Sequence, residues 1–116
     1  MIVEVIAVGT ELLLGQIVNS NTSTMGAALA ERGIDAHYQQ TVGDNLTRIA
    51  DAIRVALDRS DAIVMTGGIG PTQDDITREA VCEVTGREMV FSEDYADRLR
   101  EWWSRRWPAC CSPAVR

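Results

Sequence analysis

Short runs of apolar residues alternate along the chain with segments whose apolar residues recur every three or four positions, as in a helix. Residues 2–8 are mostly apolar and β-branched and stop at Gly9, which predicts a strand. Residues 34–42 predict a more polar strand nearer the sheet edge, and residues 62–65 predict a short strand covered on both faces. Repeated strand–helix units of this kind indicate an α/β fold with a mostly parallel sheet and right-handed crossovers.

Helix signals fill the gaps between these strands. Residues 19–22 are rich in N-cap residue types, and Gly33 is a typical helix terminator, so a helix is expected between them. Asp44 or Asn45 is expected to cap the next helix. The apolar residues that recur at helical spacing in it are Leu46, Ile49, Ala50, Ile53 and Leu57.

The second half of the chain predicts two more helices. One is expected to begin near Asp74 and end at Gly86, and another to begin after Ser92. Residues 89–91 are expected to form a short extended segment between them. Residues 10–18 are expected to form a loop whose leucines, residues 12–14, join the core, with an oligomer contact as the alternative.

The charge of the chain narrows the choice of partner. All 11 basic residues are arginine, and the net charge is −6. This excludes lysine chemistry and argues against nucleic acid or an anionic membrane as a partner, because both need a basic face. We expect a cytoplasmic protein, because the first residues resemble neither a signal peptide nor a membrane span.

Each predicted strand is followed by a loop with glycines or carboxylates. Carboxyl ends of parallel strands share one rim, so these loops are expected to form one ligand site. Glycine loops let backbone N–H groups approach a phosphate, and carboxylates beside a phosphate need a cation such as Mg²⁺. The alternatives are an ordinary turn at the glycines and a simple N-cap at Asp74. The expected ligand-binding residues are Gly9, Thr10, Glu11, Gly67, Gly68, Gly70, Pro71, Thr72 and Asp74, and the expected metal ligands are Glu11, Asp44 and Asp75.

Three segments resemble the CinA family of competence/damage-inducible proteins. They are residues 9–21 (GTELLLGQIVNSN), residues 40–45 (QTVGDN) and residues 66–80 (TGGIGPTQDDITREA). The likeness extends from residue 1 to about residue 93. It implies the three-layer molybdopterin-binding fold of molybdenum-cofactor biosynthesis proteins.

The resemblance also implies a function. In related adenylyltransferases two loop aspartates are essential, and their counterparts by motif position are Asp44 and Asp75, which we take as candidate catalytic residues. CinA-type domains are associated with metal-dependent hydrolysis of ADP-ribose, so we expect a phosphorylated, nucleotide-like ligand and a divalent metal such as Mg²⁺. The alternatives are molybdopterin binding or adenylylation, a non-catalytic binding module, and a fragment that folds only with a partner chain.

Domain organisation follows from the same comparison. Residues 1–101 are expected to form a CinA-like α/β domain that is incomplete at its C-terminus. Residues 102–116 contain all three tryptophans and no acidic residue, and we expect an atypical, disordered tail there. Exposed tryptophan surface usually finds a partner, so we expect a homo-oligomer.

Overall fold

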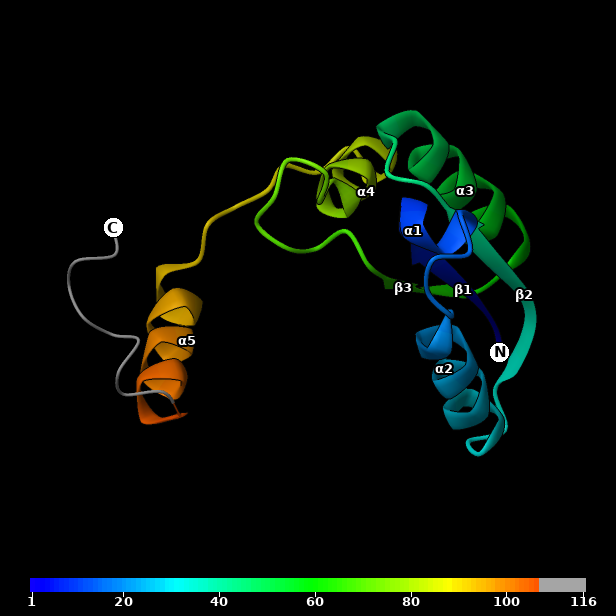
Figure 1. Cartoon of the computed structure of the whole chain (residues 1–116), viewed down its shortest axis with the longest axis horizontal. Coiled ribbons are helices and arrows are strands. Elements are labelled where there is room, and N and C mark those ends of the chain that lie inside the picture. Colours follow the sequence, from blue (N-terminus) through cyan, green and yellow to red (C-terminus); the bar gives the residue numbers. More distant parts are fainter. Residues whose placement is uncertain (107–116) are drawn as a thin grey trace.

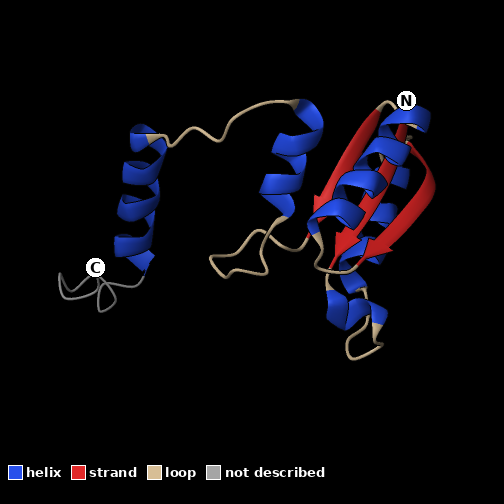
Figure 2. Ribbon diagram, turned by 90° about the horizontal axis from the view of Figure 1, so that it is seen from above, coloured by secondary structure: helices blue, strands red, loops and turns tan. Residues whose placement is uncertain are grey.

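The computed structural model describes residues 1–106 of the chain. In sequence order the elements are β1 (Ile2–Val8), α1 (Thr10–Leu13), α2 (Ser20–Ala30), β2 (Asp35–Val42), α3 (Leu46–Arg59), β3 (Ala62–Thr66), α4 (Thr77–Thr85) and α5 (Glu93–Arg106). All strand pairs are parallel and their order is β2-β1-β3. Helix α2 lies on one side of the sheet and α3 on the other, with α4 beside α3 (Figures 1 and 2). The three-layer α/β fold expected from the sequence is confirmed.

Strand β1 is the centre of this fold. It is hydrogen-bonded on both edges and covered on both faces, and Val5, Ile6 and Ala7 are fully buried. Successive side chains of a strand point to opposite faces, so a strand in this position needs a continuous apolar run. Ile6 and Val8 pack with Ile49 of α3 in the main core cluster.

Helix α3 is fixed to the sheet by its cap and its apolar stripe. The side chain of Asn45 accepts the N–H of Arg48 at 3.1 Å, so Asn45 and not Asp44 is the cap. The buried residues of the helix are Ile49, Ala50, Ala52, Ile53 and Ala56. Leu46 and Leu57, expected on this stripe, lie at its margins and are exposed. The alanines let the helix approach the sheet closely.

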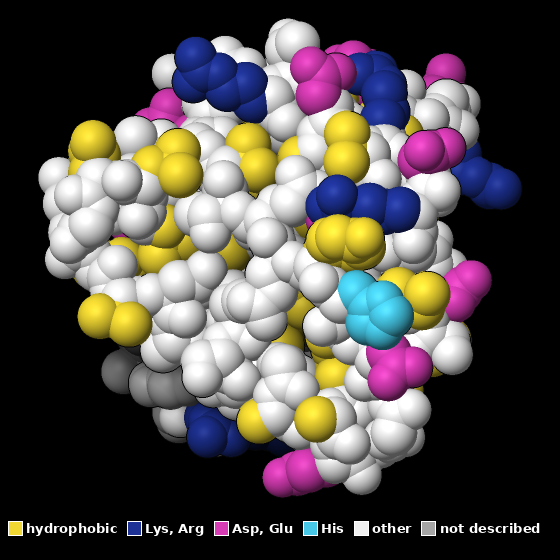
Figure 3. Space-filling model, turned by 90° about the vertical axis from the view of Figure 1, so that its right-hand side faces the viewer, with side chains coloured by type: hydrophobic (Ala, Val, Ile, Leu, Met, Phe, Trp, Pro, Cys, Tyr) yellow, Lys and Arg dark blue, Asp and Glu magenta, His cyan; other side chains and the backbone are white. Residues whose placement is uncertain are grey.

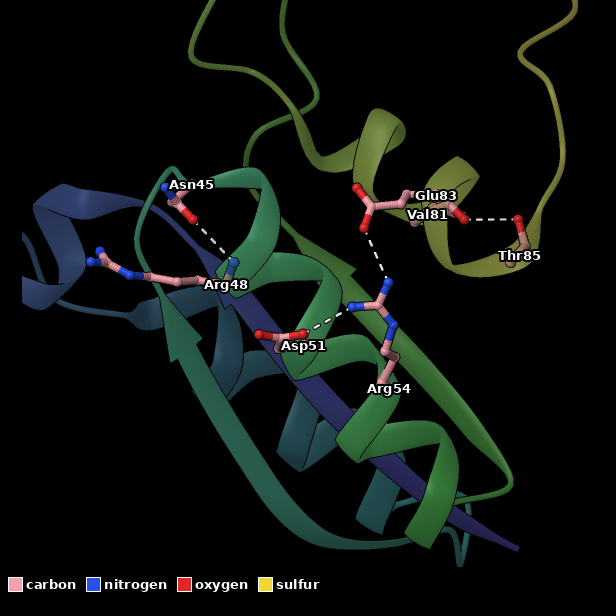
Figure 4. Close-up of polar contacts among 7 residues, drawn as sticks. All are labelled: Asn45, Arg48, Asp51, Arg54, Val81, Glu83 and Thr85. Atoms are coloured by element: carbon pink, nitrogen blue, oxygen red, sulfur yellow. Dashed lines mark hydrogen bonds and ion pairs between the residues drawn. The ribbon is translucent and has the colours of Figure 1, made fainter.

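Helix α4 packs against α3 and begins later than the sequence suggested. Arg54 of α3 donates to Asp51 on its own helix and to Glu83 on α4, at 2.9 and 3.0 Å (Figure 4). The expected start near Asp74 is wrong, because residues 72–75 close a turn of their own and the helix begins at Thr77. The expected end at Gly86 is confirmed.

Two other expectations fail for lack of a covering element. The leucines of residues 12–14 were expected in the core, yet Leu13 and Leu14 are 55% and 66% exposed, and residues 10–13 are a short helix. Residues 89–91 are exposed and belong to no strand of residues 1–106, and the extended segment expected there stays a prediction. The residues of β3 are only half-buried, because within residues 1–106 no strand pairs with its outer edge.

Helix α5 stands apart from the sheet (Figure 1). The side chain of Ser92 accepts the N–H of Tyr95, which confirms the expected cap. The helix continues through the expected domain boundary at residues 101 and 102. Tyr95, Leu99 and both tryptophans of the helix are about half exposed, and the self-association they suggest stays a prediction. The rest of the expected tail, residues 107–116, lies outside the described residues.

The described surface gives two simple observations about partners. On the side of the molecule shown in Figure 3, arginine and acidic side chains are interspersed rather than gathered into one patch. None of the helices in residues 1–106 has the length and apolar character needed to cross a membrane.

A buried ion pair holds the amino end of the sheet together. Glu4 of β1 is fully buried and accepts two hydrogen bonds from Arg59, at 2.6 and 2.9 Å, and one from Gln40 of β2 at 2.7 Å. The guanidinium of Arg59 also lies 3.8 Å from the ring centre of Tyr38. Hydrogen bonds from Arg59 hold the pKa of Glu4 below its usual value in spite of its burial. One carboxylate on β1 therefore binds both Gln40 of β2 and Arg59 of α3.

Replacing Arg59 by methionine should destabilise the protein at neutral pH by about 3 kcal/mol, because it leaves the buried charge of Glu4 without its cation. In the wild type, the stabilisation from the lowered pKa of Glu4 is present above the usual carboxyl pKa and is lost as pH falls through the lowered value. Without Arg59, burial favours the protonated acid, so the deficit should shrink on acidification. Urea unfolding at neutral and acidic pH measures both effects.

The matched control is Arg54→Met, which breaks two ion pairs whose side chains are about half exposed. Exposed pairs contribute little to stability, so this variant should lose only a small part of what Arg59→Met loses. Equal losses from the two variants at neutral pH would contradict the role given to Glu4.

Candidate functional site at the carboxyl ends of the strands

The carboxyl ends of the three strands lie at one edge of the sheet. Val8 pairs with Val42, and Ala7 pairs with Thr66, so the strands end at nearly the same level. The N–H of Gly9 continues the ladder to the carbonyl of Val42 at 2.8 Å. The loops that follow the strands therefore share one rim, as the parallel sheet predicted.

Thr10 and Asp44 join the first two loops. The N–H of Thr10 donates to Oδ2 of Asp44 at 2.9 Å, and the N–H of Asp44 donates to Oγ1 of Thr10 at 3.0 Å. The reciprocal pair fixes Asp44 at the rim and occupies one of its carboxylate oxygens. The other carboxylate oxygen, Oδ1, accepts no hydrogen bond within residues 1–106, so it is available to a ligand.

Glu11 turns back over the end of β1. A Cβ added at Gly9 would lie 2.5 Å from a carboxylate oxygen of Glu11. The absence of a side chain at Gly9 thus makes the room that this carboxylate occupies. A side chain at position 9 would displace only the flexible end of Glu11, whose carboxylate lies at the rim over the end of β1.

The glycine loop approaches the end of β1 very closely. A Cβ at Gly67, where φ is +88°, would lie 2.0 Å from the carbonyl oxygen of Val8. A Cβ at Gly68, where φ is +63°, would lie 2.2 Å from Oγ1 of Thr77. Positive φ and these two contacts exclude side chains at both positions. Packing as well as ligand access therefore requires glycine here.

Thr77 orients the peptides of this loop. Its hydroxyl donates to the carbonyl of Gly67 at 2.8 Å, and its N–H donates to the carbonyl of Gly68 at 3.1 Å. In a trans peptide the C=O and the following N–H point in opposite directions. The N–H groups of Gly68 and Ile69 therefore point away from α4. These N–H groups donate no hydrogen bond within the described structure.

Asp75 faces its own loop. Its Oδ2 accepts the N–H of Thr72 at 2.9 Å and also the hydroxyl of Thr72. These bonds from Thr72, and after them the nearby backbone of Gly70, hold the pKa of Asp75 below its usual value. Arg78 donates to the carbonyl of Gly70 at 3.2 Å, so residues 70–78 form one closed turn.

The remaining predicted residues of this loop are less engaged. Pro71 and Asp74 are exposed, and Asp74 takes part through its carbonyl, which accepts the N–H of Ile76. The N-cap position of α4 is Ile76, so the alternative interpretation of Asp74 as a simple N-cap is wrong. The helix that was expected to begin near Asp74 begins three residues later, at Thr77.

A pocket opens where the first loop, the start of α2 and the end of β3 meet. Its lining residues are Val8, Glu11, Leu12, Ile17, Val18, Asn19, Ser20, Asn21, Thr66 and Gly67. The side chain of Asn21 donates to the hydroxyl of Thr66 at 3.1 Å and closes one wall. Neither Asp44 nor Asp75 lines this pocket. It therefore combines an apolar floor with hydroxyl, amide and carboxylate groups.

The sequence analysis missed several of these lining residues. Asn19 does cap α2 as expected, since its side chain accepts the N–H of Thr22. Asn21 and Thr66 were known only as parts of the CinA-like motifs. The signal that could have identified them is position, because a polar residue in the first turn of α2 and one at the end of β3 must face each other across the rim.

The acidic residues of the rim do not form a ready-made metal site. Within residues 1–106, no group of three His, Cys, Asp or Glu side chains is placed to hold a metal ion. Glu11, Asp44 and Asp75 therefore do not converge. Mg²⁺ commonly uses only one or two carboxylates together with substrate phosphates, and Asp44 and Glu11 offer that kind of donor.

A family model described as a probable molybdopterin binding domain matches residues 4–115. The chain belongs to this family. Curated relatives include a CinA-like protein from Dictyoglomus thermophilum, 44% identical over 103 residues, which cover 89% of this chain and 25% of the relative. Another, from Caldicellulosiruptor saccharolyticus, carries the provisional name competence-damage inducible protein and is 51% identical over 106 residues, covering 91% of this chain and 26% of the relative.

Solved structures of the molybdopterin-binding family agree with the fold. The protein CinA from Thermoplasma acidophilum, described as of unknown function, superposes with a TM-score of 0.82 at 36% identity, covering 89% of this chain and 61% of that one. The molybdopterin biosynthesis enzyme MoaB from Thermus thermophilus gives 0.70 at 26% identity, covering 76% and 57%. The resemblance to CinA is confirmed. The chain spans about a quarter of the length of the curated relatives it matches.

We expect Gly67→Ala to destabilise the protein by more than about 3 kcal/mol, because it adds a methyl group against the Val8 carbonyl as well as an unfavourable φ. Gly15→Ala is the matched control, since Gly15 has φ +69° with nothing within 4 Å of the added Cβ. The control should lose only about 1–2 kcal/mol. Denaturant unfolding compares the two, and equal losses would contradict the close approach of the loop to β1.

Proposed function

We propose that the rim binds a phosphorylated, nucleotide-like molecule. The observation that carries this is the adjacency of the pocket and the glycine loop, which share Gly67. The pocket offers an apolar floor and polar walls, which suit the ring or the sugar of such a ligand. The N–H groups of Gly68 and Ile69 supply donors beside it, which suit a phosphate.

The polar groups of the rim match the two ends of such a ligand. Glu11 and Asp44 are acceptors and favour a hydroxyl or N–H group, whereas they repel a phosphate. The phosphate farther from these carboxylates is therefore expected at the glycine loop, with backbone N–H groups and Arg78 as its partners, so that the P–O–P linkage lies between the glycine loop and Asp44. A divalent cation bound to the ligand's phosphates would relieve the remaining repulsion, and Mg²⁺ stays a prediction.

Hydrolysis of a nucleotide diphosphate such as ADP-ribose is the reaction we propose for this site. Water adds across the P–O–P linkage, giving AMP and ribose 5-phosphate. Asp44 is the proposed catalytic residue, since its position is fixed by Thr10 and one of its oxygens remains available. The support for this reaction is the relationship to CinA-like proteins.

The second candidate is molybdopterin binding or adenylylation. It is favoured by the structural likeness to MoaB of Thermus thermophilus, which is named as a molybdopterin biosynthesis enzyme. A pterin and a purine are both planar heterocycles with hydrogen-bonding edges, so the pocket suits either. A binding module without turnover uses the same contacts.

We expect ADP-ribose to raise the melting temperature of the wild-type protein, because a ligand that binds only the folded state stabilises it by mass action. Asn21→Ala opens the pocket wall at Thr66 and should lose most of this rise. Ser23→Ala is the control, because Ser23 is on the same helix but exposed and lines no part of the pocket. Thermal-shift titrations with and without Mg²⁺ make the comparison.

Equal shifts for Asn21→Ala and Ser23→Ala would contradict the pocket assignment. A rise with a molybdopterin analogue but not with ADP-ribose would favour the second candidate. Release of AMP from ADP-ribose by the wild type, with a large loss in Asp44→Asn, distinguishes an enzyme from a binding module.

A further inference from the structure

In the loop that precedes α4, hydrogen-bond donors are already occupied by an anion of the chain itself, the carboxylate of Asp75. The carboxylate of Asp75 accepts the N–H and the hydroxyl of Thr72, both at Oδ2. Convergent N–H and O–H donors around one negatively charged oxygen are the arrangement that a bound phosphate oxygen usually receives. In this structure, Asp75 receives it.

The surroundings of this carboxylate suit an exchange of anions. The loop is continuous with Gly68 and Ile69, whose N–H groups point away from α4. Arg78 lies near enough to Asp75 to lower its pKa and contacts the carbonyl of Gly70. A guanidinium at this place can balance the added charge when a phosphate and the displaced carboxylate are both nearby.

We propose that Asp75 closes the glycine loop in the absence of ligand, and that a phosphate group of the ligand displaces it from the N–H and hydroxyl donors of Thr72. This inference rests on the proposed function, since it requires a phosphorylated ligand. Asp75 is then a positioning residue that competes with the phosphate. An anion that takes its place has to compete with a carboxylate held by its own loop, so Asp75 weakens the binding of a phosphate to this loop.

The role implied by the family resemblance is different. A catalytic or metal-binding Asp75 would face the ligand and would not compete with its phosphate for the loop donors. A structure with bound phosphate separates the two roles directly. In the exchange, phosphate oxygens lie within hydrogen-bond distance of the N–H and the hydroxyl of Thr72, and the Asp75 side chain is turned out. A crystal structure of the wild type with inorganic phosphate in which Asp75 still accepts from Thr72 would overturn the proposal.

A second measurement uses affinity. Calorimetric titration with inorganic phosphate in the presence of EDTA should show Asp75→Asn binding roughly tenfold more tightly than the wild type, because a neutral amide holds the loop donors less strongly than a charged carboxylate. Asp58→Asn removes the same charge from an exposed position on α3 and should bind as the wild type does. Circular dichroism checks that both variants are folded.

The outcomes distinguish this inference from the proposed function. If ADP-ribose raises the melting temperature of the wild type but Asp75→Asn binds phosphate no more tightly than Asp58→Asn, the exchange is wrong and the ligand assignment stands. If neither ADP-ribose nor phosphate binds the wild type or Asp75→Asn, both fail. Should Asp75→Asn not fold, the phosphate-bound structure of the wild type decides alone.

Discussion

The candidate site depends on how closely the glycine loop approaches the end of β1. The carbonyl of Val8 leaves no room for a side chain at Gly67, and Thr77 fixes the next two peptides from the other side. This contact brings the end of β3 beside the first loop and the start of α2, and the pocket lies between them. The position of the pocket is thus set by backbone contacts, which a change of side chains alone cannot easily move.

The rim is organised by its own hydrogen bonds before any ligand arrives. Thr10 holds Asp44, and Thr72 holds Asp75, while Glu11 fills the space over Gly9. Asp44, held in this way, costs little reorganisation when a ligand binds, which favours affinity, whereas Asp75 has to leave its donors to a phosphate. Asp44 and Asp75 each have a partner within their own loop or a neighbouring one, so a shared metal site needs the ligand to supply further donors.

Much of this could be predicted from the sequence, because it follows from local pattern and parallel topology. The apolar run of β1, the polar edge strand β2, the cap at Asn45 and the glycine that ends α4 all have local signals. Parallel pairing then places the three loops at one rim. The glycine positions of the site were found for the same reason.

The parts that could not be predicted depend on contacts between distant residues or on which way a side chain turns. The buried Glu4 meets Arg59 across 55 positions, and Asn21 meets Thr66 across 45. Asp75 turns toward Thr72 instead of the ligand side, and nothing in the spacing indicates that choice. The leucines of residues 12–14 were misplaced because apolar character alone does not show whether a covering element exists.

Hydrogen exchange measured with and without ADP-ribose tests most directly whether the ligand site lies at the carboxyl ends of the strands. Binding there should slow exchange in residues 9–12, 19–22 and 67–72 and leave residues 33–36 and 60–62, at the opposite end of the sheet, unchanged. Slowed exchange at the opposite end or in α5, with no change in the glycine loop, would contradict this placement of the site.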